Sequence, residues 1–109
     1  MALIHAQPFD VISLEPLAEK IHEVKTHSVL KTAHLQLMRL VMVAGQTMPQ
    51  HEVAGEITIQ CLEGSVLIIT PGRSSALAAG EMMALPAREP HALEALTDSS
   101  LLVTVLLKP

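Results

Sequence analysis

The sequence predicts an all-β fold, a barrel or sandwich of short strands. From residue 26 onward, apolar and polar residues alternate with a period of two in short runs. Gly, Pro, Asp and Ser residues separate these runs about every eight to twelve residues, a spacing typical of sandwiches and barrels. Half of the 109 residues are hydrophobic, which is enough apolar material for one packed core. We therefore expect a single domain.

The first part of the chain is predicted to be an N-terminal extension over residues 1–32, with the barrel over residues 33–109. Residues 11–14 are compatible with a short strand. Pro16 is followed by Leu17, Ile21 and Val24, a spacing that indicates a short amphipathic helix over 16–24. A helix of that length depends on tertiary packing, so the extension should pack on the barrel or on a partner subunit.

The strands that follow are predicted from the alternation. Residues 44–49 are expected to form a turn, Glu63 and Gly64 to form a hairpin turn, and residues 71–75 to form a loop. The last strand is apolar on both faces, which favours a homodimer in which a second subunit covers the outer face. The predicted strands span residues 28–31, 35–43, 57–62, 65–70, 76–78, 82–85, 91–95 and 101–107.

Composition excludes several classes of function. Phe9 is the only aromatic side chain besides histidine, and the net charge is −4 without a basic cluster, so no nucleic-acid partner is expected. Apolar runs are too short to span a bilayer, and the N-terminus does not resemble a signal peptide. The single Cys61 forms no intrachain disulfide and is compatible with a cytoplasmic location. Any ligand pocket should be aliphatic, with histidines supplying its polarity.

Two stretches carry the candidate site, GQTMPQHEVAGEITIQCLEG at 45–64 and GEMMALPAREPH at 80–91. They resemble the two motifs of small cupins, G-x5-H-x-H-x(3,4)-E-x6-G and G-x5-P-x-G-x2-H-x3-N. The resemblance covers roughly residues 33–107 and implies a jelly-roll barrel, or double-stranded β-helix, of two Greek keys. The residues that match these motifs are Gly45, His51, Gly64, Gly80, Pro86 and His91.

The resemblance also implies a metal site, but this chain departs from it. Cupins that hold iron, manganese, zinc or nickel use three histidines and a carboxylate. Val53 occupies the second histidine position and Ile57 the carboxylate position, so only His51 and His91 remain. A catalytic metal usually has three protein ligands. The expected cofactor is therefore at most a weakly held divalent metal (Zn, Ni, Fe or Mn).

Other side chains are candidates to complete the site. A third metal ligand would have to come from Glu56, Cys61 or His34, and Glu56 faces away unless a bulge at 54–55 shifts the register. Arg39 would bind a substrate carboxylate at the barrel mouth or extend to the surface. Five methionines form a set that would suit copper, but in a core without aromatic residues we interpret them as gap-filling residues. They are Met38, Met42, Met48, Met82 and Met83.

The function expected from these residues is binding of a small molecule in an apolar barrel cavity through His51 and His91. Arg39 and Glu56 are the further candidate ligand-binding residues. One alternative is a metal-dependent cupin enzyme of the isomerase or dioxygenase type with a relaxed ligand set. Another is a dimeric sensory or structural module. The sequence leaves open whether the chain is an enzyme, because this barrel hosts many unrelated chemistries.

Overall fold

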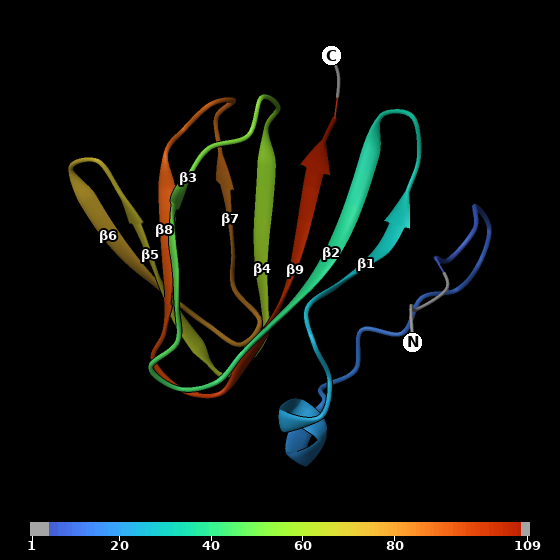
Figure 1. Ribbon diagram of the computed structural model, residues 1–109, viewed down its shortest axis with the longest axis horizontal. Helices are drawn as coiled ribbons and strands as arrows, with labels where there is room; N and C mark the ends of the chain where they lie inside the picture. The colour runs from blue at the N-terminus through green and yellow to red at the C-terminus, as the bar shows by residue number, and fades with distance from the viewer. Residues whose placement is uncertain (1–4, 108–109) are drawn as a thin grey trace.

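Two antiparallel β-sheets face one another and come together at one end (Figure 1). This computed structural model describes residues 5–107, so the ends of the predicted extension and barrel, 1–4 and 108–109, lie outside the described residues. The five-stranded sheet has the order β1 (His27–Lys31), β2 (Leu35–Met42), β9 (Ser99–Leu106), β4 (Ile57–Glu63) and β7 (Met82–Leu85). The four-stranded sheet has the order β3 (Thr47–His51), β8 (His91–Ala95), β5 (Ser65–Thr70) and β6 (Arg73–Ala78).

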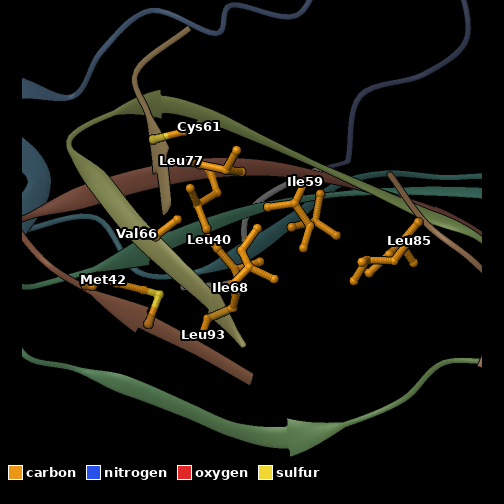
Figure 2. Close-up of a cluster of buried hydrophobic side chains, with 13 residues drawn as sticks. Leu40, Met42, Ile59, Cys61, Val66, Ile68, Leu77, Leu85 and Leu93 are labelled. Carbon is orange, nitrogen blue, oxygen red and sulfur yellow. The ribbon is translucent and has the colours of Figure 1, made fainter. Parts of the chain in front are cut away.

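The core fills the space where the two sheets approach each other. Successive side chains of a strand point to opposite faces, so Ile57, Ile59 and Cys61 of β4 all point inward and are buried. Their partners on the facing sheet include side chains of β5 and β8, and Figure 2 shows Ile59 and Cys61 in one cluster with Val66, Ile68 and Leu93. The predicted all-β jelly-roll architecture is confirmed. Most predicted strands occur within one or two residues of their expected bounds, and residues 65–70, 82–85 and 91–95 match fully.

The strand β3 was not predicted. Pro49 in its centre, with Gly45 before it, resembles a turn, and the predicted turn over 44–49 is wrong beyond Gln46. Proline cannot donate a hydrogen bond to a neighbouring strand, but it is tolerated in edge strands. Because β3 lies at the edge of its sheet, its outer side has no neighbouring strand that would require a hydrogen bond from residue 49.

The predicted hairpin at Glu63 and Gly64 is also wrong. The strands that flank it lie in different sheets, because β4 pairs with β7 and β9 while β5 pairs with β6 and β8. Gly64 therefore forms a corner between the sheets. It has φ +80°, and a Cβ there would lie 2.2 Å from the carbonyl oxygen of Asp98. Only glycine fits this corner.

The N-terminal extension contains less regular structure than predicted. Residues 11–14 form no strand, because none of their backbone groups pairs with the sheet. The helix is a single 3-10 turn, Ala18–His22, rather than 16–24. Ala18 has φ +53°, outside the right-handed helical region. The helix therefore begins at Ala18 and does not extend back to Pro16. No helix within residues 5–107 is long and apolar enough to cross a bilayer.

A buried ion pair holds this extension against the five-stranded sheet. Glu63 accepts hydrogen bonds from the backbone N–H groups of Leu17 (2.7 Å) and Ala18 (2.9 Å). Arg39 donates to the carbonyl oxygen of Glu15 (3.0 Å) and to Ser100 Oγ (2.9 Å). The Arg39 and Glu63 side chains lie 3.5 Å apart, and Arg39 is buried. We refer to this arrangement as the Arg39–Glu63 clamp.

Burial and the neighbouring groups of the clamp shift the pKa of Glu63. Burial alone would raise the pKa of Glu63. The hydrogen bonds from Leu17, Ser100 and Ala18 and the charge of Arg39 outweigh this effect and bring the pKa below its ordinary value. Such a carboxylate stabilises the fold above its unfolded-state pKa, and the contribution disappears as pH falls through the lowered folded-state pKa.

We predict that Glu63→Gln lowers the free energy of unfolding by about 2 kcal/mol at neutral pH, because it leaves Arg39 buried without a counter-charge. Urea unfolding checks the value. Below about pH 4.3, the ordinary pKa of glutamate, the stability of the wild type should fall towards that of the variant. Glu52→Gln, at an exposed carboxylate, is the control. Equal stability of wild type and Glu63→Gln at pH 7 would contradict the role of the clamp.

Candidate functional site

A cavity of about 550 Å³ opens at the splayed end of the two sheets. This volume lies within the usual range of small-molecule pockets, roughly 300–1,000 Å³. Its walls come from both sheets and are mainly aliphatic, and no Asp, Glu, Lys or Arg is among the described lining residues. The lining residues used below are Gln36, Met38, Met48, His51, Val53, Ile57 and His91.

The two motif histidines meet in this cavity, as expected. His51 of β3 and His91 of β8 are direct partners across the strand pair. Their ring centroids lie 4.4 Å apart, with the ring planes inclined by 58°. His91 is 4% exposed, whereas His51 is exposed while lining the same cavity. The pair therefore runs from the solvent-facing mouth into the interior.

A bulge in β3 brings His51 opposite His91. Met48 pairs with Leu93 and His51 pairs with His91, so three residue steps on β3 match two on β8. In a regular strand, residues three apart point to opposite faces. The extra residue at Pro49–Gln50 turns both Met48 and His51 into the cavity, which is a common use of bulges near functional sites.

Backbone carbonyls fix the tautomer of both histidines. His51 Nδ1 lies 3.2 Å from the carbonyl oxygen of Pro49, and His91 Nδ1 lies 2.9 Å from that of Glu89. A carbonyl oxygen only accepts hydrogen bonds, so each Nδ1 carries the proton and donates it. In the neutral form of such a ring, the Nε2 atom carries the lone pair. The pair presents two hydrogen-bond acceptors or two nitrogen ligands.

The positions that would complete a divalent metal site are apolar. Val53 and Ile57 line the cavity with the histidines, so these two positions lie where the resemblance places ligands. Their side chains cannot bind a metal. Among the residues that the structure describes, no group of three or more His, Cys, Asp or Glu side chains converges. The residues present do not fit a divalent ion that requires three or four nitrogen and oxygen ligands.

The candidate third ligands lie elsewhere. Glu56 is exposed and does not line the cavity; no bulge shifts it inward, because β4 begins in regular register at Ile57. Cys61 is fully buried in the core, where its thiol contacts the carbonyl oxygens of Glu63 and Gly64. Burial raises the pKa of this thiol, which keeps it protonated. His34 is exposed at the start of β2.

Arg39 is also separate from the histidines. Its side chain points to the outer face of the five-stranded sheet and is held in the Arg39–Glu63 clamp. Burial lowers the pKa of Arg39, and the charge of Glu63 opposes this effect. Arg39 does not line the cavity, so the expected contact with a ligand carboxylate at the barrel mouth receives no support from its position.

Three cavity residues were not identified as site residues from the sequence. Gln36 and Met38 line the wall opposite the histidines, and the Gln36 side chain donates to Ser28 Oγ (2.9 Å). The alternation of residues along β2 predicted that Gln36 and Met38 share one face with Leu40. Met48 was named only in the methionine set that we interpreted as gap-filling, and the segment around it was expected to be a turn.

Solved structures share this architecture. A conserved protein of unknown function from Streptococcus pyogenes aligns over 100% of this chain and 99% of its own, with 20% identity and a TM-score of 0.77. A cupin superfamily protein from Desulfitobacterium hafniense aligns over 99% of both chains, with 17% identity and a TM-score of 0.78. An RmlC-like cupin from Desulfovibrio desulfuricans aligns over 94% of this chain and 98% of its own, with 22% identity and a TM-score of 0.70.

These likenesses define the class of the molecule. No family model and no curated protein matches the sequence. The two-sheet jelly roll is shared with solved structures of cupin superfamily and RmlC-like cupin proteins, one of them described as a double-stranded β-helix fold. The chain is a small cupin-fold protein. At these identities the likeness establishes the fold, and the activity has to be argued from the site.

We predict that Val53→His combined with Ile57→Glu creates a divalent metal site. Both positions line the cavity with His51 and His91, so the variant would present three imidazoles and a carboxylate. The purified variant should retain about one Zn²⁺ or Ni²⁺ per chain after dialysis, measured by elemental analysis, and the metal should raise its melting temperature. If a buried glutamate at position 57 weakens folding, the single variant Val53→His still tests whether position 53 lies close enough to His51 and His91 to share a metal ion. If neither variant binds metal more tightly than the wild type, the four positions do not converge.

Proposed function

We propose that this protein binds a small, largely aliphatic molecule in the barrel cavity, with His51 and His91 holding its polar group. The observation that carries the proposal is the pairing of two oriented imidazoles inside an otherwise aliphatic cavity. Burying a polar group without a partner is costly, so polar side chains kept in such a cavity favour a polar partner on the ligand.

The charges of the cavity restrict the ligand. The described lining residues include no fixed charge, and Arg39 is held outside the cavity in the Arg39–Glu63 clamp. A permanently charged ligand would lose its hydration without gaining a counter-charge. The free Nε2 lone pairs accept hydrogen bonds, which suits a hydroxyl, an amide N–H or a carboxylic acid whose proton can be shared with an imidazole. Gln36 on the opposite wall offers a second polar contact.

The aliphatic walls supply most of the affinity. Each buried methylene group contributes about 0.8 kcal/mol, so about five of them yield about 4 kcal/mol. That gain corresponds to a dissociation constant of about 1 mM. Tighter binding then depends on the hydrogen bonds to the histidines, each worth about 1 kcal/mol net. We therefore propose a ligand with a short alkyl body and one polar head.

We predict that linear alcohols, amides and carboxylic acids bind with affinity that increases with chain length until the cavity is full. Isothermal titration calorimetry checks the series. Val53→Phe should abolish binding by filling the cavity, while Val43→Phe, at an exposed position outside it, should not. His51→Ala should weaken binding by about fivefold to tenfold, the loss of one hydrogen bond. Absence of binding by the whole series, or unchanged binding in Val53→Phe, would contradict the proposal.

We further propose that the protein is a homodimer joined through the outer face of the five-stranded sheet. Leu30, Leu37 and Thr104 are neighbours in one row across β1, β2 and β9, and Thr58 and Ala84 continue this row on β4 and β7. The row carries no charge. Each chain has a net charge of −4, so an uncharged face is where two copies approach with the least repulsion. A two-fold axis would pair this face with itself.

Leu37→Glu should convert the dimer to a monomer, because it places a carboxylate at the centre of the uncharged row. Sedimentation velocity over a range of protein concentrations measures the mass. Ile69→Glu, at an exposed apolar residue of the other sheet, is the matched control and should leave the dimer intact. A wild-type protein that sediments as a monomer at the highest concentration would exclude this interface.

A further inference from the structure

The strand β6 is an outer edge of the four-stranded sheet and pairs only with β5 among the described strands. The N–H of Ala78 donates to Glu81 Oε1 (2.8 Å) instead of to β5. Residues two apart in an antiparallel strand turn their backbone groups to the same side. The N–H and C=O groups of Ser74 and Ala76 therefore also point away from β5. Within residues 5–107, no hydrogen bond outside the strand pairs reaches them.

The other three sheet edges are each interrupted, covered or short. In β3 the edge carries Pro49 and a bulge. In β1 the carbonyl oxygen of Val29 accepts a hydrogen bond from the N–H of Ala6 (2.8 Å). The strand β7 has four residues and is followed by Pro86. Such features protect sheet edges against pairing with another chain.

The edge of β6 has none of these protections. Its six residues pair with β5 in an uninterrupted register. The side chains beside its outward backbone groups belong to serine and alanine, which are too small to shield them. Among the described edges, β6 is therefore the one best suited to accept another strand.

A second cavity, of about 370 Å³, lies beside this edge. The strands β6 and β7 leave the turn at 79–81 and diverge, one into each sheet, and residues of both line the cavity (Figure 1). Ile68 and Leu85, both buried, give it an apolar floor. Arg73 and Ser75 of β6 line it together, because residues two apart share one face of a strand. The free edge and the cavity therefore form one continuous surface.

This cavity, unlike the one that holds the histidines, is lined by charged side chains. Arg73 lines it from β6, and Glu89 lines it from the segment that follows β7 in the other sheet. Neither takes part in an ion pair within residues 5–107. A carboxylate on a bound molecule is therefore attracted beside β6 and repelled near Glu89.

We infer that an extended peptide segment of a partner protein docks at this surface as an additional strand beside β6. Its backbone pairs with the outward N–H and C=O groups of Ser74 and Ala76, an aliphatic side chain enters the cavity, and an acidic side chain lies next to Arg73. In this mode of recognition, backbone hydrogen bonds supply affinity and side-chain pockets supply specificity.

Strand geometry also sets the spacing of the recognised residues. Side chains directly opposite one another on neighbouring strands lie about 5 Å apart. Arg73 and Ser75 are two residues apart, so the acidic and the aliphatic residue of the peptide are two positions apart as well. The inference concerns the outer side of the sheets and does not rest on a ligand in the barrel cavity.

A second copy of β6 fits this surface less well than such a peptide. On the face that would meet the cavity it carries Arg73, Ser75 and Leu77, and Leu77 is buried in its own core. A paired copy would therefore leave the cavity without an aliphatic side chain. Each chain also carries a net charge of −4, which opposes association of two copies.

Amide hydrogen exchange measured by NMR tests the docking mode, with the blocked peptide Ser-Thr-Glu-Thr-Leu-Thr-Ser as the probe. In the free protein, the amides of Ser74 and Ala76 should exchange rapidly, whereas those of Ser75 and Leu77, which face β5, should be protected. Saturating peptide should slow the exchange of Ser74 and Ala76. Unchanged exchange at both would overturn the inference. Protection without peptide that disappears on dilution would show a second copy at this edge and would also overturn it.

Proline at position 76 tests the backbone pairing. Ala76→Pro removes an outward N–H and no hydrogen bond to β5, so it should weaken peptide binding by at least about fivefold, measured by chemical-shift titration. Val53→Phe fills the barrel cavity and should leave peptide binding unchanged, which separates this inference from the proposed function. Wild-type affinity in Ala76→Pro, or loss of peptide binding in Val53→Phe, would contradict docking at β6.

A variant at an exposed position tests the charge recognition without disturbing the fold. The wild type should prefer the probe to its analogue with Gln in place of Glu by about twofold to fivefold, as for a partly exposed ion pair. Arg73→Gln should abolish this preference. Lys31→Gln, which removes an exposed cation of β1 outside the cavity, is the matched control and should retain it. An equal preference in Arg73→Gln and wild type would overturn the assigned peptide chemistry.

Discussion

The position of β9 between β2 and β4 is the constraint on which the rest of the structure depends. Its backbone is hydrogen-bonded on both edges. The register is regular from Leu35 to Met42 on one side and from Ile57 to Cys61 on the other, with a shift between Cys61 and Glu63. Its inward side chains form part of the core and the cavity wall, and Thr104 on its outer face belongs to the proposed dimer row. At its first residues, Ser99 packs against the Gly64 corner, and Ser100 bonds to the Arg39–Glu63 clamp.

The site depends on a smaller constraint, the bulge in the edge strand β3. An interior strand has neighbours on both sides that hold it in register, whereas an edge strand tolerates an extra residue and a proline. The bulge directs His51 and Met48 into the same cavity. Val53 and Ile57 place aliphatic side chains at two of the four positions to which the resemblance assigns metal ligands, and both line the cavity. The proposed binding of a largely aliphatic molecule rests on this lining.

Local pattern was sufficient for much of the architecture. Strands such as 65–70 and 91–95 were predicted because alternation with a period of two is a direct consequence of strand geometry. The motif spacing placed His51 and His91 together, and the structure confirms that they meet. The edge strand β3 was missed because Pro49 breaks most strands, and its tolerance depends on which strands are neighbours. That information is not local.

The sequence by itself determined the all-β class and most strand positions, because both follow from residue spacing along the chain. The resemblance to the two cupin motifs implied the histidine pair. Only the tertiary structure decided where long-range partners lie. It placed Arg39 in a clamp with Glu63 instead of in the cavity, it separated β4 from β5 at Gly64, and it kept Glu56 outside. Pairing between distant strands decides such contacts, and no short stretch of sequence encodes it. Met48 lines the cavity for the same reason.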